Sequence, residues 1–207
     1  NIRKIRLIME LRDLGITDNK TLSSIELIPR ELFLTDAFKD QAYENVALPI
    51  GYEQTISQPL IVALMTQSLE LSKNHKILEL GTGCGYQTAI LSKLVRRIYT
   101  IERIKPLLTE AEKTFSKLRI TNVVTKFGDG NKGWIEQKPF DRIIITAATK
   151  NLSKEITNQI KDNGIIIAPM INKNNKQVLT KFIKSNNQLI KKDITEVVFV
   201  PNITGIN

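Results

Sequence analysis

Histidine and cysteine are almost absent from this chain, which has one residue of each, His75 and Cys84, among 207. A zinc site built on two histidines and the HExxH motif are therefore excluded, and no internal disulfide can form. A Ser-His-Asp hydrolase would have to use His75, which lies in the turn-like stretch SKNHK and reads as a solvated turn residue. The sequence predicts no metal site, and a single cysteine fits a reducing, cytoplasmic location.

Long hydrophobic runs are missing as well. Hydrophobic residues make up 42% of the chain, yet no apolar run approaches the roughly 20 residues that span a bilayer. We therefore expect no membrane partner. The apolar content is enough for one packed core, and no repeat or long linker interrupts it, so residues 1–207 are predicted to form a single domain and a monomer.

Acidic residues are outnumbered, which gives a net charge of +9, but the excess is uneven. Residues 1–60 contain 7 Lys/Arg and 9 Asp/Glu, whereas the remainder contains 23 and 12. A basic chain can bind nucleic acid. However, basic residues occur in no run longer than two and do not alternate with aromatic residues. We interpret the lysines as solvated and expect no nucleic-acid partner.

Short apolar runs alternate with helical patterns from residue 76 onward. Strands are predicted at 76–81, 97–102, 122–127, 141–148 and 164–170, and helices at 88–95, 106–118 and 152–160, the last ending near 163–164. This alternation is typical of an α/β fold, a Rossmann-like, doubly wound, mostly parallel sheet with helices on both faces. Residues 177–184 and 189–201 flank a polar turn and predict an antiparallel C-terminal hairpin that completes seven strands.

The first 75 residues have a different pattern and predict an N-terminal helical appendage. Helices are expected at 2–15, around 21–27 and at 59–71, and the first has apolar residues at Ile2, Ile5, Ile8 and Met9. A polar loop lies between the second and third helices. We therefore divide the chain into a helical and loop part, 1–75, and a sheet core, 76–207.

A glycine-rich loop, ELGTGCGYQ (79–87), follows the first strand of the core. Gly81, Gly83 and Gly85 allow a tight turn and a close approach to a ligand at the carboxyl edge of a parallel sheet. Their spacing is G-x-G-x-G, whereas a dinucleotide fingerprint needs G-x-G-x-x-G and a Walker loop needs a Gly-Lys-Ser/Thr ending. The spacing therefore argues against both. We read Cys84, inside this loop, as a small space-filling residue.

Two carboxylates at neighbouring strand ends complete the pattern of this loop. Glu102 ends the second strand, 21 residues after Gly81, where a carboxylate can accept hydrogen bonds from both ribose hydroxyls of an adenosine. Asp129, in FGDG (127–130), could contact the adenine amino group. The combination predicts an adenosine-containing cofactor, and it matches the S-adenosylmethionine-dependent methyltransferase fold better than a dehydrogenase.

The polar run LPIGYEQTISQPL (48–60) precedes the third predicted helix. Thr55 and Ser57 are two residues apart, so in an extended loop their hydroxyls face the same way. Gln54 and Gln58 could donate further hydrogen bonds, and two prolines limit the freedom of the loop. The run is therefore interpreted as a loop that holds a ligand. The alternative is that Ser57 caps the following helix.

These motifs together carry a resemblance to a known family, and they occur in order over nearly the whole chain. The chain resembles the protein-L-isoaspartate O-methyltransferases in IPRELFL (28–34), AYENVALPIGYEQTISQP (42–59), KILELGTGCGYQTAIL (76–91), VRRIYTIERI (95–104), GDGNKGW (128–134), FDRIIITAA (140–148) and the C-terminal VFVP. LPIGYEQTISQP is the most diagnostic of these.

The resemblance implies repair of damaged proteins. A methyl group passes from S-adenosyl-L-methionine to the α-carboxylate of an L-isoaspartyl residue in a protein or peptide, leaving S-adenosyl-L-homocysteine, and the ester closes to a succinimide that hydrolyses partly to aspartate. The resemblance assigns Ser57 to the active site. Substrate-binding residues are then expected at Ile56, Thr55, Gln54 and Gln58, and cofactor-binding residues at Glu79, Gly81, Thr82, Gly83, Gly85, Tyr86, Glu102, Arg103, Asp129, Gly130 and Thr146.

Some positions depart from the pattern of that family, and two rival functions stay open. Asn45 stands where the family usually has aspartate, and Ala47 replaces a frequent proline. A nucleic-acid methyltransferase is one rival, but it predicts Asn/Asp-Pro-Pro-Tyr/Phe after the fourth strand, where this chain has ITAATK (145–150). The other rival is an inactive adenosine-binding module that acts as an interaction subunit.

Overall fold

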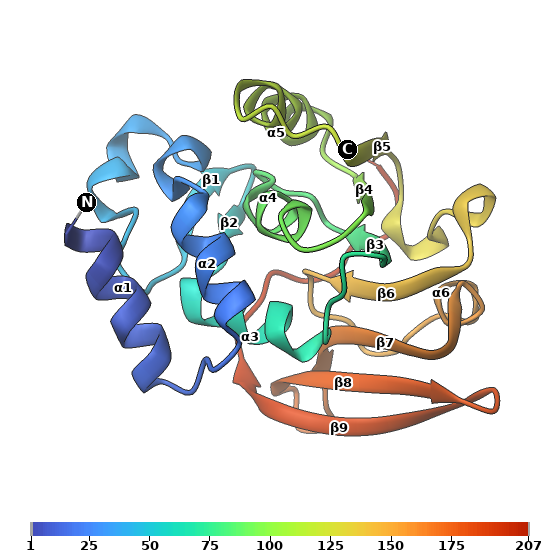
Figure 1. Cartoon of the computed structure of the whole chain (residues 1–207). Coiled ribbons are helices and arrows are strands. Elements are labelled where there is room, and N and C mark those ends of the chain that lie inside the picture. The colour runs from blue at the N-terminus through green and yellow to red at the C-terminus, as the bar shows by residue number, and fades with distance from the viewer. Residues whose placement is uncertain (1, 207) are drawn as a thin grey trace.

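The computed structural model describes residues 2–206 and has one sheet of seven strands with helices against it (Figure 1). The helices are α1 (Ile2–Asp13), α2 (Asn19–Leu27), α3 (Pro59–Ser68), α4 (Tyr86–Ser92), α5 (Lys105–Lys117) and α6 (Lys154–Thr157). The strands of the large sheet are β3 (Lys76–Leu80), β4 (Arg97–Glu102), β5 (Val123–Phe127), β6 (Phe140–Ile145), β7 (Ile160–Ile171), β8 (Gln177–Ser185) and β9 (Gln188–Val197).

The strand order of this sheet is β5-β4-β3-β6-β7-β8-β9. Neighbouring strands from β5 to β7 run parallel, and β8 and β9 are added antiparallel, with β9 at the edge. The predicted Rossmann-like fold with a C-terminal hairpin is confirmed. The chain leaves β3 in one direction through β4 and β5 and then returns to β6 on its other side. Ligands of such sheets bind outside the carboxyl ends of the strands at this switch point.

Successive residues of the central strands β3 and β6 point to opposite faces of the sheet, and both of these faces are buried. Ile77 of β3 packs in one apolar cluster with residues of α3 and α4, whereas Leu78 packs in another with Ile156 of α6. The same alternation places Ile144 of β6 on the first face and Ile143 on the second. Burial on both sides explains why these strands are continuous apolar runs in the sequence.

The helix predicted at 152–160 is shorter than expected. The segment α6 covers only Lys154–Thr157, and Ile160 already pairs with Phe140 of β6. Asn163, which we predicted to end the helix, lies inside β7 with φ +58°, where the register between β6 and β7 shifts. The turn-forming pair Asn163–Gly164 therefore marks an irregularity in a strand, not a helix end.

The N-terminal helices lie together beside the sheet, coloured blue in Figure 1. The helix predicted at 2–15 is α1, and its buried residues are Leu7 and Leu11, whereas Ile2, Ile5 and Met9 are exposed. Ile8 is partly buried and packs against the N-terminal core. Among the described residues, no helix combines the length and the apolar character that a membrane crossing requires.

Candidate active site

Residues 48–56 of the polar run fold into a β-hairpin, where we predicted an extended loop, and the run ends in the first turn of α3. Strand β1 (Leu48–Gly51) pairs antiparallel with β2 (Gln54–Ile56), with Leu48 opposite Ile56. Tyr52 and Glu53 form the turn with φ +53° and +57°, as a type I′ turn requires. Ile56 is buried in the core at 2% exposure. Its burial fixes which side of the hairpin faces the protein.

Ser57 lies in the short connection between β2 and α3 and is half-buried. The N-cap residue of α3 is Gln58, whose side chain makes no capping hydrogen bond, and Pro59 opens the helix. The alternative that Ser57 caps this helix is therefore wrong. Its side chain remains available to line a cavity.

The glycine loop turns directly after β3 and contacts the end of β6. The Thr146 hydroxyl donates hydrogen bonds to the carbonyl oxygens of Leu80 (3.0 Å) and Gly81 (2.7 Å). Gly81 has φ +96°, and a Cβ at this position would lie 2.3 Å from the Thr146 Oγ1. Only glycine allows Thr146 to approach this closely. The two hydrogen bonds of Thr146 then hold the ends of β3 and β6 together at the switch point of the sheet.

Glu102 ends β4 beside this loop and is 5% exposed. Its Oε2 accepts a hydrogen bond from the Gly83 amide (2.8 Å), and its Oε1 accepts one from the Ile104 amide (2.9 Å). A carboxylate has about four acceptor sites, so two bonds leave capacity for a ligand. The side chain thus both shapes the loop and presents acceptor oxygens to the cavity beside it.

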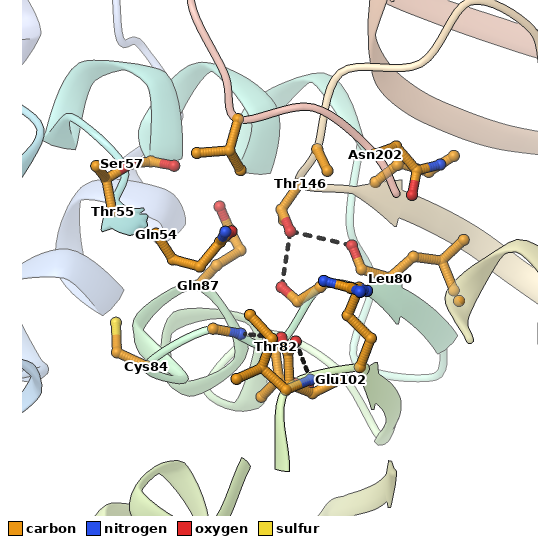
Figure 2. Close-up of a pocket in the computed structure, with 18 of the residues that line it drawn as sticks. Gln54, Thr55, Ser57, Leu80, Thr82, Cys84, Gln87, Glu102, Thr146 and Asn202 are labelled. Atoms are coloured by element: carbon orange, nitrogen blue, oxygen red, sulfur yellow. Dashed lines mark hydrogen bonds between the residues drawn. The ribbon is translucent and has the colours of Figure 1, made fainter. Parts of the chain in front are cut away.

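A cavity lies between the glycine loop, the hairpin and the C-terminal segment. In Figure 2, Gln54, Thr55 and Ser57 lie on one side of it, and Thr82 and Glu102 lie on another. Most of the predicted site residues come together here. Those that line the cavity are Gln54, Thr55, Ile56, Ser57, Gly81, Thr82, Gly83, Tyr86, Glu102, Arg103, Gly130 and Thr146.

Three predicted site residues, Glu79, Gly85 and Asp129, do not line this cavity. They contact residues and elements next to it. Glu79 is fully buried and accepts hydrogen bonds from Thr88 and Thr100, and burial raises its pKa to about 7. Gly85 is the N-cap of α4. The two oxygens of Asp129 accept hydrogen bonds from the amides of residues 131 and 205, each at 2.9 Å.

The C-terminal segment is part of the site, and sequence reasoning missed it. Val200, Pro201, Asn202 and Ile203 line the cavity. Hydrogen bonds fix this segment in place. The amide of residue 205 donates to Asp129, and the carbonyl of residue 205 accepts from Arg103 Nε (3.0 Å). The side chains at 131 and 202 are also hydrogen-bonded to each other. The VFVP run was the only signal of this wall.

A second cavity adjoins the first and shares part of its wall. Thr55, Ser57, Thr146 and Val200 line both cavities. The second cavity is otherwise lined by Ala47, Gln58, Ile61, Glu196, Val197, Val198 and Phe199. Molecules bound in the two cavities would therefore be adjacent at the hydroxyl groups of Thr55 and Ser57.

Cys84 and His75 have no part in an acid–base or nucleophilic arrangement. Burial raises the pKa of the Cys84 thiol to about 11, so it remains protonated at neutral pH and packs against the N-terminal core. His75 lies in the turn before β3 and accepts a hydrogen bond from the Ser72 amide at Nδ1 (3.1 Å). Neither residue behaves as a catalytic group.

Asn45, which departs from the pattern of the resembled family, has a local explanation. Its Oδ1 accepts a hydrogen bond from the Leu60 amide in the first turn of α3 (3.0 Å), as an aspartate could. Its Nδ2 donates to Glu10 Oε1 of α1 (2.9 Å). An aspartate could not donate and would place two carboxylates together, so the amide matches the acidic neighbour.

Comparison with known proteins agrees with this architecture. A model of the protein-L-isoaspartate(D-aspartate) O-methyltransferase (PCMT) family matches residues 2–206. The chain is 49% identical to a protein-L-isoaspartate O-methyltransferase of Maricaulis maris over 203 residues, 98% of this chain and 95% of that protein. It is equally identical to one of Paramagnetospirillum magneticum over 205 residues, 99% and 96%.

Solved structures give the same result. A protein-L-isoaspartate O-methyltransferase, 27% identical, superposes with a TM-score of 0.88 over 96% of this chain and 65% of that one. A Plasmodium falciparum protein solved with S-adenosyl-L-homocysteine, 22% identical, shares the fold with a TM-score of 0.84 over 96% and 97% of the two chains. The chain belongs to the protein-L-isoaspartate(D-aspartate) O-methyltransferase family.

Proposed function

We propose that this protein repairs damaged proteins and peptides by transferring a methyl group from S-adenosyl-L-methionine to the α-carboxylate of their L-isoaspartyl residues. One observation carries the proposal. The cavity at the glycine loop and the cavity beside the hairpin share a wall that contains Thr55, Ser57 and Thr146. A substrate in each cavity would contact these shared residues. The two substrates would therefore be adjacent there, as a transfer reaction requires.

The residues of the first cavity fit an adenosine-containing cofactor. Gly81 and Gly83 line the cavity without a side chain, and Glu102 has free acceptor capacity toward it. We assign cofactor contacts to Gly81, Thr82, Gly83, Tyr86, Glu102, Arg103, Gly130 and Thr146, and a supporting role to Glu79, Gly85 and Asp129. When bound, the cofactor supplies a methyl group on a sulfonium, an electrophile that a carboxylate can attack directly.

The chemistry explains why the site contains no histidine. A carboxylate has a reference pKa near 4 and is ionised at neutral pH, so the nucleophile needs no general base. The protein then contributes by alignment and close approach, which can lower a barrier by about 7–11 kcal/mol. We assign the orientation of the substrate carboxylate to the Ser57 hydroxyl. Thr55, Gln54, Gln58 and the backbone of Ile56 form the rest of the substrate contacts.

The setting of the reaction is part of the proposal. We propose that the enzyme works in the cytoplasm as a monomer and that its macromolecular substrates are proteins and peptides, not nucleic acids. The single cysteine, protonated and packed against the core, supports a reducing location. The lysines of β8 and β9 are distributed along the strands, and two of them, Lys181 and Lys191, form ion pairs with Glu70 and Asp193. Lysines that are spread out and paired in this way do not form a continuous basic surface for nucleic acid.

The decisive assay compares an isoaspartyl peptide with its normal aspartyl twin, each incubated with labelled S-adenosylmethionine. We expect base-labile methylation of the isoaspartyl peptide only, because the two peptides differ only in where the free carboxylate lies. Equal labelling of both peptides contradicts the proposal. Lack of labelling despite intact cofactor binding favours the inactive module, and labelling of RNA or DNA instead favours the nucleic-acid enzyme.

Ser57→Ala is expected to lower kcat about 10–100-fold for the isoaspartyl peptide. The reason is that a hydrogen bond to a charged group contributes about 1.5–3 kcal/mol. The affinity for S-adenosylhomocysteine, measured by calorimetry, should change less than about twofold, a margin below 0.5 kcal/mol. Ser116→Ala, at an exposed serine of α5, is the matched control and should leave both values unchanged. A collapse of cofactor affinity in Ser57→Ala would show that the role is misassigned.

A further inference from the structure

Arg30 is a fully buried arginine whose guanidinium contacts three backbone carbonyls. Its Nη1 donates to the Ala42 carbonyl (2.9 Å), and its Nη2 donates to the carbonyls of Val46 (3.0 Å) and Ser57 (3.1 Å). The side chain comes from the short 3₁₀ segment Arg30–Phe33, after α2. One residue therefore holds three points of the chain that are 12, 16 and 27 positions away from it.

This charge is buried without a carboxylate partner. Within residues 2–206, no ion pair includes Arg30, and burial lowers its pKa from the ordinary arginine value. Its Nε has no hydrogen-bond partner either. Burying a charge is costly unless the surroundings compensate it, and here the compensation comes only from carbonyl dipoles and an aromatic face. Such an expensive arrangement suggests a role beyond filling space.

The contacts of Arg30 join the two walls of the site. Ala42 and Val46 lie before the β1–β2 hairpin, and Ser57 lies directly after it, so the guanidinium holds both ends of the hairpin. On the other side, its Cζ lies 5.7 Å from the centre of the Tyr86 ring. Tyr86 begins α4 after the glycine loop and lines the cofactor cavity. Arg30 therefore connects the serine-bearing segment to the cofactor loop.

We propose that Arg30 is a positioning residue for methyl transfer, which sets the place of Ser57 relative to the cofactor cavity through the Ser57 carbonyl and the Tyr86 ring. This inference rests on the proposed function. Arg30 touches neither cavity, so it acts only through these neighbours. A misplacement of about 1 Å in an aligned transfer can lower the rate about 100-fold, so the loss of this clamp should reduce turnover.

Lysine cannot replace this arginine. The guanidinium is planar and directs its donors in a fixed fork, whereas an ammonium is a compact, strongly hydrated point charge. Arg30→Lys keeps the charge and loses the fork. Arg30→Gln loses both the charge and the fork. Because it buries no charge, we expect it to destabilise the fold less than Arg30→Lys does. The two variants together separate the charge from the geometry.

Arg142 offers a matched control. It is a half-buried arginine at the start of β6, and its guanidinium also donates to three carbonyls, those of Leu69, Glu70 and Asp141. It lines neither cavity. Arg142→Lys and Arg142→Gln should therefore destabilise the protein through the same kind of loss, without reaching the site.

The experiment measures kcat and KM for an isoaspartyl peptide, the affinity for S-adenosylhomocysteine and Tm in all four variants and the wild type, well below the lowest Tm. For both Arg30 variants we expect kcat to fall at least about 10-fold, with cofactor affinity within about threefold of wild type. For both Arg142 variants we expect kcat to stay within about twofold despite a lower Tm.

Three results would overturn the role of Arg30. The first is an unchanged kcat in both Arg30 variants, and the second is an equal fall of kcat in the Arg142 variants. The third is that neither Arg30 variant folds, since the residue would then serve stability alone. A wild-type enzyme that does not label the isoaspartyl peptide contradicts the proposed function instead, so the two failures can be told apart.

Discussion

Glu102→Ala is expected to raise the dissociation constant for S-adenosylhomocysteine about 100-fold. The substitution removes the acceptors of the Gly83 and Ile104 amides and the acceptor oxygens that we assign to the cofactor. Hydrogen bonds to a charged group contribute about 1.5–3 kcal/mol each, and 100-fold in affinity corresponds to about 2.7 kcal/mol. The loop would lose its anchor and the ligand would lose its acceptor.

Calorimetric titration of the folded variant with S-adenosylhomocysteine measures this effect. Asp141→Ala is the matched control because its carboxylate also accepts a hydrogen bond from a backbone amide, that of Lys76 (2.7 Å), but does not line the cavity. Its effect on affinity should stay below about threefold, or roughly 0.6 kcal/mol. If the two substitutions weaken binding equally, Glu102 has no special role in holding the cofactor.

The central strands of the sheet, such as β3 and β6, were predictable because they are buried on both faces. A strand with no polar face is a continuous apolar run, and such runs between helical patterns allow few other arrangements. The exception is the region around Asn163. Asn and Gly are read locally as turn formers, whereas here pairing with β6 continues across them. A strand irregularity and a helix end share the same local signal.

The buried side of α1 could not be predicted for a related reason. The helix has apolar residues around much of its circumference, and Leu7 and Leu11 are buried while Ile2, Ile5 and Met9 are exposed. Periodicity indicates a helix but does not say where its neighbours lie. In this chain the packing against the N-terminal core decides which apolar residues are covered.

The candidate site also contains parts that local sequence motifs predict and parts that depend on contacts between distant residues. The glycine loop and Glu102 were found because the carboxyl ends of parallel strands meet at one edge, so short motifs can be placed without a structure. The contact between Asp129 and the backbone of residue 205 spans 76 positions, and the clamp of Arg30 on Ser57 spans 27. No local pattern encodes either contact. The sequence therefore predicted a cofactor contact for Asp129 but not its second set of partners, the backbone amides of residues 131 and 205.

Gly85→Ala is expected to destabilise the folded protein by about 2–5 kcal/mol and to lower Tm by roughly 5–15 °C. Gly85 has φ +89°, which costs an L-residue about 1–2 kcal/mol. In addition, a Cβ there would lie 2.6 Å from the Phe115 ring and 3.1 Å from the Ala111 Cβ, both on α5. Overpacking of this kind costs about 1–3 kcal/mol, because neither backbone nor ring can yield freely.

Gly51→Ala separates the two causes in a thermal-unfolding experiment. Gly51 has the same φ of +89°, but a Cβ there would meet nothing within 4 Å. Its substitution should therefore cost only the backbone strain, about 1–2 kcal/mol. Adding Phe115→Leu to Gly85→Ala should recover part of the lost stability, although Phe115→Leu alone lowers it. If Gly51→Ala is as harmful as Gly85→Ala, and Phe115→Leu recovers nothing, contact between the cofactor loop and α5 does not explain the need for glycine.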